Sequence, residues 1–195
     1  MKLILINAPP RAGKDTAAWA LKHYYHGTVP VIIERMSFPL KRAFAGMLNT
    51  HCDPLGRVHP YENHKDEPIP MLSQLQPTSY RNWQIAFSED FMKVFHGQNI
   101  FGLLLAERLL AHTNNELVII PDCGFQIEVE TILETIHPHD RIMLIQIERP
   151  GTKWDSREPV TAPPSIATLR ILNDRTQEEF ESLIIEMTRK WIETP

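Results

Sequence analysis

The chain has 195 residues, 43% of them hydrophobic, which is enough for one substantial core and too little for two ordinary domains. Its net charge is −4 and its isoelectric point is near 6.1, which argues against an extended nucleic-acid surface and favours a small ligand. No apolar run reaches the about 18 residues of a membrane span, so no membrane partner is expected. Cys52 and Cys123 lie far apart, a usage typical of free thiols in the reducing cytoplasm.

The first predicted elements are a strand and a helix that enclose a Gly-Lys loop. Leu3 to Ile6 has the length and β-branched content of a buried parallel strand, and residues 17–24 continue with apolar positions at helical spacing. Backbone N–H groups at a helix N-terminus point outward unpaired, and with the helix dipole they form an anion site. We therefore interpret residues 7–16 as a phosphate-binding loop.

This loop departs from the pattern GxxxxGK[ST] at two positions. Ala8 replaces the first glycine, and Asp15 stands where a hydroxyl residue is usual. A carboxylate facing a nucleotide would repel phosphate, so we expect Thr16 to make the hydroxyl contact to phosphate or magnesium. An ordinary strand-turn-helix is the alternative. The candidate nucleotide-binding residues are Arg11, Ala12, Gly13, Lys14, Asp15 and Thr16.

Residues 28–38 predict a second strand, and residues 40–48 predict the helix that follows it. Lys41 and Arg42 begin that helix, just beyond the carboxyl end of the strand. Ligands of open α/β sheets bind at this edge, so the two cations are candidate phosphate contacts. Solvated surface charge is the alternative for each of them.

Residues 51–79 are rich in proline, histidine and charge and lack a clear period, which indicates an irregular insertion. The period returns over residues 80–95, where one helix face carries Arg81 and Gln84. An arginine offers a forked charge for phosphate and a glutamine can read a base edge, although a polar solvent face is the alternative. The predicted apolar stripe of this helix consists of Trp83, Phe87, Phe91, Val94 and Phe95.

The remaining chain alternates between helices and strands. Residues 99–112 and 125–136 predict helices, and residues 117–120 and 141–148 predict buried strands, so the pattern is βαβ and the sheet parallel. Asp122 follows a strand at its carboxyl end, where P-loop proteins orient magnesium and its waters. A turn carboxylate is the alternative.

The segment after residue 148 carries the last set of candidate residues. Three cations lie in the nine residues from Arg149 to Arg157, which could close over phosphates as a lid, or form a charged surface loop. A short strand at residues 168–172 follows, and then a final helix. Thr176 and Glu179 have the spacing of a capping box at the start of that helix.

Taken in order, these motifs resemble the phage-type deoxynucleoside monophosphate kinases, members of the wider P-loop nucleoside monophosphate kinase group. Residues 11–16 resemble that family's GKDT signature, and residues 36–41, Met-Ser-Phe-Pro-Leu-Lys, are similar to its Ser-Phe-Ala-x-Pro-Leu-Lys segment. Arg81, Gln84 and Glu89 resemble its Arg, Gln and Glu helix, without the Gly-Thr that usually precedes the acid.

The later part of the chain resembles the family with two departures. Gly124 stands where an arginine is common, which leaves one expected cation unplaced, and Arg157 stands where a histidine is frequent. Residues 171–174 resemble the closing strand and the Asn-Asp loop that neighbours the adenine, which makes Asn173 a candidate cofactor contact.

The resemblance implies an α/β fold of the three-layer P-loop kinase type, with helices on both faces of a parallel five-stranded sheet in the order 2-3-1-4-5. It implies one domain over residues 1–195, with a substrate-binding insertion at about 51–98 and a lid-like loop at about 149–165. If the chain is phage-encoded, the compartment is the host cytoplasm. A homodimer stays open.

The implied reaction is transfer of the γ-phosphoryl group of ATP, with Mg²⁺, to the 5′-phosphate of a deoxynucleoside monophosphate. The implied catalytic residues are Lys14, Asp122, Arg149 and Arg157, with Thr16 and Asp122 on the metal. The implied substrate-binding residues are Ser37, Phe38, Lys41, Arg42, Arg81, Gln84 and Glu89.

Two alternative functions stay open. The same nucleotide site would suit a kinase of a hydroxymethylated pyrimidine, either free or within DNA. Ala8 and Gly124 would suit a catalytically silent nucleotide-binding or interaction protein. Base specificity and the preference between deoxyribose and ribose are not given by the sequence.

Overall fold

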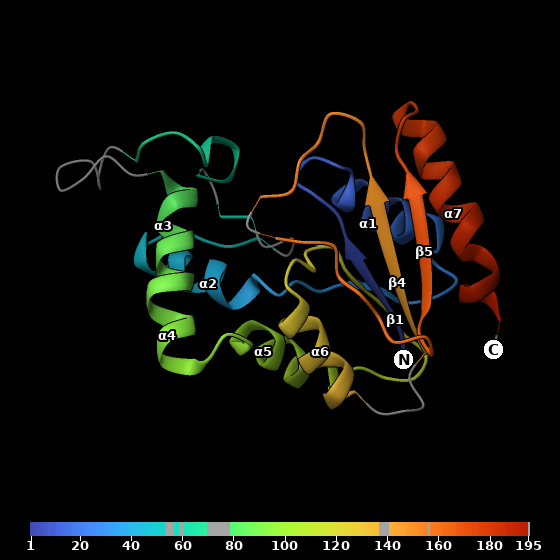
Figure 1. Cartoon of the computed structure of the whole chain (residues 1–195), viewed down its shortest axis with the longest axis horizontal. Coiled ribbons are helices and arrows are strands. Elements are labelled where there is room, and N and C mark those ends of the chain that lie inside the picture. Colours follow the sequence, from blue (N-terminus) through green and yellow to red (C-terminus); the bar gives the residue numbers. More distant parts are fainter. Residues whose placement is uncertain (54–56, 59–60, 70–78, 137–140, 156, 195) are drawn as a thin grey trace.

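The computed structural model of the chain (Figure 1) describes residues 1–53, 57–58, 61–69, 79–136, 141–155 and 157–194. Its centre is a sheet of five parallel strands in the order β2-β3-β1-β4-β5. This confirms the predicted strand order and direction. The strands are β1 (Lys2–Asn7), β2 (Val31–Ile33), β3 (Leu117–Ile120), β4 (Arg141–Glu148) and β5 (Ala167–Leu172).

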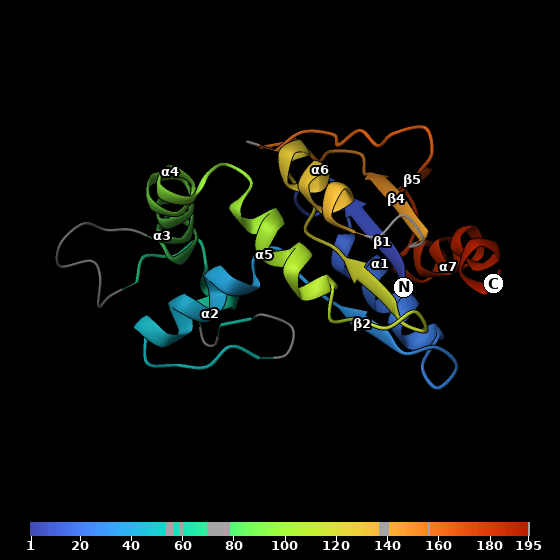
Figure 2. The same ribbon diagram turned by 90° about the horizontal axis from the view of Figure 1, so that it is seen from below.

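Helices cover both faces of the sheet, as predicted (Figures 1 and 2). α1 (Lys14–Tyr24) packs beside α7 (Gln177–Glu193) on one face, and α5 (Ile100–Leu109) packs beside α6 (Gln126–Thr135) on the other. The three layers bring the strand-to-helix loops together at the carboxyl edge of the sheet, which lies at the top of Figure 1.

The central strand β1 supplies both core layers. Ile4 and Ile6 belong to the cluster under α1 and α7, whereas Leu3 and Leu5 belong to the cluster under α5 and α6. All of these side chains are at most 1% exposed. Successive side chains of a strand point to opposite faces, so a strand covered on both faces must be a continuous apolar run. For this reason the apolar run at residues 3–6 correctly predicts a strand that is buried on both faces.

A group of helices, here called the side lobe, lies to the left of the sheet in Figure 1. It consists of α2 (Phe38–Met47), the 3₁₀ helix η1 (Tyr61–His64), α3 (Tyr80–Ala86), the π-helix η2 (Phe87–Met92) and α4 (Lys93–His96).

The side lobe has its own small core. The ring of Phe44 meets the rings of Tyr80, Trp83 and Phe87 edge-on, with centroids 5.9, 4.5 and 5.6 Å away. Edge-to-face pairs of this kind add about 0.5–1.5 kcal/mol each beyond simple burial. The buried members of this cluster are Phe44, Ala45, Leu48, Val58, Ile69 and Tyr80.

The apolar stripe predicted for residues 80–95 is exposed in its second half. Phe91, Val94 and Phe95 are 46%, 65% and 69% exposed. The rings of Phe87, Phe91 and Phe95 still follow one another along the helix, with centroids 5.2 and 5.1 Å apart, so the stripe continues through the π-helix at Phe87–Met92 as an exposed face.

The second predicted strand is also too long. Residues 28–38 contain only the three strand residues of β2, because the chain turns away from the sheet at Met36 and Ser37. The backbone N–H groups of these two residues donate to the carboxylate of Asp122 instead of to a neighbouring strand.

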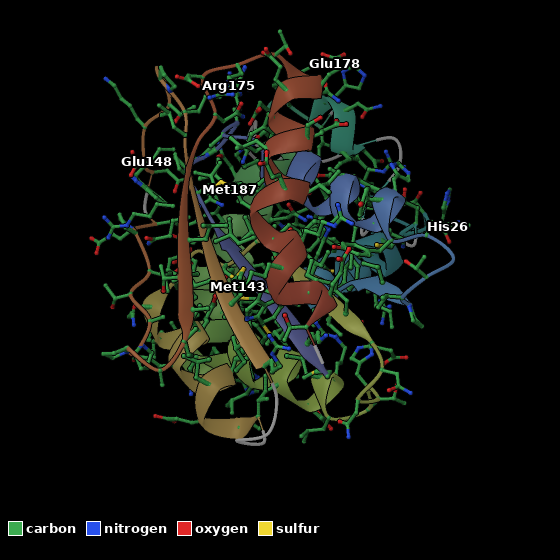
Figure 3. The ribbon with its side chains drawn as sticks, turned by 90° about the vertical axis from the view of Figure 1, so that its right-hand side faces the viewer. His26, Met143, Glu148, Arg175, Glu178 and Met187 are labelled. Carbon is green, nitrogen blue, oxygen red and sulfur yellow. The ribbon has the colours of Figure 1, made fainter. Side chains whose placement is uncertain are left out.

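Figure 3 looks onto β5 and α7 and shows Glu148 and Arg175 toward the end of the sheet where α7 begins. The predicted capping box is confirmed there: Glu179 N–H donates to Thr176 Oγ1 over 3.3 Å, and Thr176 N–H donates to Glu179 Oε2 over 3.1 Å. Within the described ranges, no helix combines the length and the apolar character that crossing a membrane requires.

Candidate functional site

The loop between β1 and α1 depends on Gly13. Its φ is +105°, a left-handed conformation, and an added Cβ would lie 2.7 Å from Asn173 Nδ2 and 3.1 Å from Phe180 Cε1. Both the backbone conformation and the lack of space therefore require glycine here. Asn173, only 6% exposed, donates from Nδ2 to the carbonyl of Ala12 over 2.9 Å. The structure thus places Asn173 beneath the loop as a support.

The start of α1 offers unpaired donors. In the described part of the chain, the backbone N–H groups of Gly13, Lys14, Asp15 and Thr16 find no acceptor, and no side chain caps the helix. Ala12 differs, because its N–H donates to the carbonyl of Pro9 over 3.3 Å. The remaining donors and the helix dipole favour an anion at this point.

The structure also accounts for Ala8 in place of glycine. Ala8 is 2% exposed, packs in the core under α1 and α7, and does not have a positive φ. Arg11 has the left-handed conformation instead, with φ of +65°. A non-glycine residue in this conformation costs about 1–2 kcal/mol, so Arg11 carries backbone strain in this loop. Arg149 lies beside it, donating to the Arg11 carbonyl over 3.4 Å.

Lys14 is folded over this loop. Its Nζ donates to the carbonyls of Ala8 and Pro9, each over 3.0 Å. Burial first, and then repulsion by Arg157, lower the pKa of Lys14 to about 8, against the attraction of nearby carboxylates. The ammonium is therefore held close to the free N–H groups in a partly dehydrated place, where its charge acts strongly on an anion.

Asp15 is paired with Arg35, a residue that the sequence reasoning missed. Arg35 Nη2 lies 2.5 Å from Asp15 Oδ1, and the Arg35 side chain is only 14% exposed. Arg35 Nε is buried and has no hydrogen-bond partner among the described residues. The Asp15 carboxylate is therefore neutralised by a cation. No sequence signal indicated this role, because Arg35 lies within the strand predicted over residues 28–38, whereas β2 ends at Ile33.

Asp122 and Ser37 are brought together at the carboxyl edge. Asp122 Oδ1 accepts from the N–H of Met36 over 3.0 Å, and Oδ2 accepts from the N–H and the hydroxyl of Ser37 over 3.1 and 2.8 Å. A carboxylate has about four lone-pair positions, so it retains capacity for one more donor, such as a metal-bound water. Asp122 thus fixes the start of α2 and still presents charge to the site.

Arg157 also reaches this region. Its Nε donates to Asp155 Oδ1 over 2.8 Å, and Nη2 donates to Oδ2. Asp122 and Asp155 both raise the pKa of Arg157, the hydrogen bond to Asp155 being the largest cause. The structure therefore gathers Lys14, Asp122 and Arg157 within electrostatic reach of one another.

The cations expected to hold a second phosphate are paired with acids of the side lobe. Lys41 Nζ lies 3.1 Å from both oxygens of Glu62, and each side chain is 15% exposed. Arg81 Nε lies 2.5 Å from Asp66 Oδ1. Arg42 is exposed and lies over the ring of Phe38, 5.5 Å from its centroid. An incoming phosphate would have to replace these carboxylates.

Two other predicted substrate residues have local partners. Gln84 Nε2 donates to the Tyr80 hydroxyl over 2.8 Å. Glu89 Oε1 lies 2.7 Å from the ammonium of Lys93, which packs 3.9 Å from the centre of the Phe125 ring. Contact of Gln84 with a base, and of Glu89 with the substrate, stays a prediction.

The buried Glu128 interacts electrostatically both with Glu89 and Lys93 and with Asp122. Burial raises the pKa of Glu128 to about 7, against the attraction of Lys93 and with the help of Asp122 and Glu89. The sequence reasoning assigned no role to Glu128.

Two acids of the side lobe interact electrostatically with cations near the phosphate-binding loop. The pKa of Asp66 is lowered first by its hydrogen bond to Arg81 and also by the charge of Arg11. Glu62 likewise contributes to the raised pKa of Arg35, although the neighbouring Asp122 and Asp15 contribute more. Asp66 of the lobe and Arg11 of the loop therefore attract each other electrostatically.

A cavity of about 390 Å³ lies between the start of α6 and the segment after Arg157. It does not suit a phosphate, because its described lining includes the carboxylates of Glu130 and Glu158 and no lysine or arginine. The described residues also contain no group of three or more His, Cys, Asp or Glu side chains arranged to hold a metal ion.

No protein-family model matches the chain, and no curated protein matches it. Among solved structures, it is similar to a mutant APS kinase from Mycobacterium tuberculosis, with 11% identity over 96% of each chain and a TM-score of 0.47. It is also similar to a gluconokinase from Sinorhizobium meliloti 1021, with 12% identity over 98% of this chain and 94% of that one, and a TM-score of 0.46. These similarities are remote, and the functional assignment rests on the site.

Proposed function

We propose that the protein is a kinase that transfers the γ-phosphoryl group of ATP to the 5′-phosphate of a deoxynucleoside monophosphate. The observation that carries this proposal is the start of α1, where the N–H groups of residues 13–16 are unpaired and the Lys14 ammonium is folded onto the carbonyls of the same loop. A polyanion such as the triphosphate of ATP suits that combination. The order of motifs that resembles deoxynucleoside monophosphate kinases supports the choice of acceptor.

The donor would bind along the loop. The N–H groups of residues 13–16 would hold its β and γ phosphates, with Lys14 as the mobile charge. Thr16 and Asp122 suit Mg²⁺, which binds few protein oxygens directly and keeps waters and phosphates as its other ligands. When bound, Mg²⁺ would neutralise charge that develops on the phosphates. Thr16 would offer its hydroxyl, and Asp122 would use its remaining acceptor capacity on a metal-bound water.

The acceptor would bind between the loop and the side lobe. Lys41 and Arg81 would hold its phosphate after release from Glu62 and Asp66, two acids of the segment around η1, and the exposed Arg42 would join them. Ser37, Phe38, Gln84 and Glu89 would line the acceptor side.

The chemistry needs no protein base, because the acceptor phosphate is already anionic. The catalytic task is alignment of the two phosphates and neutralisation of their charge. Lys14, Arg149 and Arg157 supply three cations on the loop side, and Asp155 orients the guanidinium of Arg157.

The test is a coupled assay of ADP release over the deoxynucleoside and ribonucleoside monophosphates, with free hydroxymethylated pyrimidines and DNA containing them as competing acceptors. We expect ADP release with at least one deoxynucleoside monophosphate. Transfer only to the modified pyrimidines or to DNA would replace the proposed acceptor, although the net charge of −4 disfavours DNA. ATP binding without transfer to any acceptor would identify a silent nucleotide-binding protein.

A further inference from the structure

The space beside the Cα of Gly124 is filled by the side chain of Arg157. If a Cβ were added to Gly124, its three nearest heavy atoms would all belong to Arg157: Cδ at 2.4 Å, Cγ at 2.9 Å and Cβ at 3.7 Å. Gly124 is buried, and its φ lies outside the left-handed region. Other residues could therefore adopt its backbone conformation, and what glycine provides here is space.

Asn7, at the end of β1, bonds to the backbone beside Gly124 and to the backbone beside Arg157. Its Nδ2 donates to the carbonyl of Cys123 over 2.9 Å and to that of Glu158 over 3.3 Å. Cys123 directly precedes Gly124, and Glu158 directly follows Arg157. Asn7 Oδ1 accepts from the N–H of Val160 over 3.0 Å, and Asn7 is only 1% exposed. The distance between Gly124 and Arg157 is thus set by a buried amide.

Hydrogen bonds to Asp155 fix the orientation of the Arg157 side chain. Its side chain is 25% exposed, and its Nε and backbone N–H donate to Asp155 Oδ1 over 2.8 and 3.0 Å. Its charge acts on both Lys14 and Asp122. The alkyl chain is therefore held by the space over Gly124, and the guanidinium is held by Asp155.

We propose that Gly124 is a positioning residue, whose missing side chain seats the alkyl chain of Arg157 and thereby keeps the guanidinium within electrostatic reach of Lys14 and Asp122, where it acts on the transferred phosphoryl group. Only the action on phosphate rests on the proposed function. The seating is a property of the free protein and can be tested without nucleotide.

The variant that tests the seating is Gly124→Ala. The atoms that its methyl group would displace belong to a flexible side chain and not to backbone, so we expect the variant to fold and Arg157 to move. Gly46→Ala is the matched control, because among the described residues nothing lies within 4 Å of a Cβ added at Gly46.

The first readout is the Nε–H resonance of Arg157, followed by NMR with ¹⁵N-labelled arginine and assigned with Arg157→Ala. Since this Nε donates to Asp155 Oδ1 over 2.8 Å, displacement of the alkyl chain in Gly124→Ala should shift the resonance. Gly46→Ala should leave it unchanged. An unchanged Arg157 resonance in Gly124→Ala would overturn the seating, whether or not the protein is a kinase.

The second readout is phosphoryl transfer by the single and double variants. Misplacement by about 1 Å can cost about 100-fold in rate, so we expect a loss of that order in kcat for Gly124→Ala, with the KM for ATP little changed. The double variant Gly124→Ala/Arg157→Ala should be no slower than Arg157→Ala. Additive losses would overturn the proposal, because Gly124 would then act independently of Arg157. If the wild type transferred phosphate to no acceptor, the proposed function would fail, and so would the part of the proposal that concerns phosphate.

Discussion

The affinity for ATP should fall as the pH rises through 8, because Lys14 binds phosphate only in its charged form. Burial first, and then repulsion by Arg157, lower the pKa of this ammonium from 10.5 to about 8 in the free protein. Bound phosphates would raise that pKa again, since an opposite charge favours the ammonium. Binding above pH 8 must therefore take up a proton, and the free energy of this step weakens the apparent affinity.

The size of the effect follows from the pKa. With a value near 8, about nine tenths of the Lys14 side chains are charged at pH 7 and about one tenth at pH 9. The apparent Kd for Mg-ATP should therefore rise about tenfold between pH 7 and pH 9, or about 1.4 kcal/mol. With the ordinary pKa of 10.5, the change over the same range would be only about 3%.

The assay is titration calorimetry with Mg-ATP and no acceptor, at constant ionic strength from pH 6.5 to pH 9.5. The matched control is Lys14→Arg, whose guanidinium stays charged over this range and whose affinity should not change with pH. Arg157→Ala should move the fall in affinity to higher pH, because it removes a repulsive charge. A wild-type Kd that stays constant to pH 9 would refute the reasoning about Lys14.

Three predictions concern stability, measured as the free energy of unfolding in urea. Asn7→Leu removes three hydrogen bonds at a buried position and should cost about 3 kcal/mol, and a loss below about 1 kcal/mol would contradict the bridging role. Gly102→Ala should lower the free energy of unfolding by about 1–3 kcal/mol, because the Cβ added at Gly102 would meet the backbone of Glu128 at 2.6 Å. Gly46→Ala should leave the free energy of unfolding unchanged. The raised pKa of Glu128 makes the folded state bind more protons than the unfolded state between pH 4.5 and about 7, so stability falls as pH rises through that window. Glu128→Gln should reduce that fall by about 3 kcal/mol, and an unchanged pH profile would contradict the assignment.

The central layers of the fold were predictable because they follow from strand physics. A strand covered on both faces must be apolar throughout, and residues 3–6 and 117–120 show this plainly. The side lobe was less predictable, since the π-turn at Phe87–Met92 leaves no periodic mark in advance. The early end of β2 depends on Asp122, which lies far away in the chain.

The candidate site was predictable where a residue's role follows from its place in an element. Lys14 follows Gly13 at a helix start and Asp122 follows a strand, and both lie at the carboxyl edge. The ion pairs were not predictable, because only tertiary packing brings Arg35 to Asp15 and Lys41 to Glu62. The same is true of Gly124, whose meaning depends on where Arg157 lies.

The central claim is that Lys14 acts on the phosphates of ATP during transfer to a nucleoside monophosphate. Its most direct test is steady-state ADP formation by Lys14→Ala, with urea unfolding confirming an intact fold. The matched control is Lys22→Ala, in the same helix, where the ammonium lies over the ring of Trp19. We expect kcat to fall about 1,000-fold or more for Lys14→Ala, the order by which one cation accelerates phosphoryl transfer, and not to fall for Lys22→Ala. Unchanged turnover in Lys14→Ala would contradict the account.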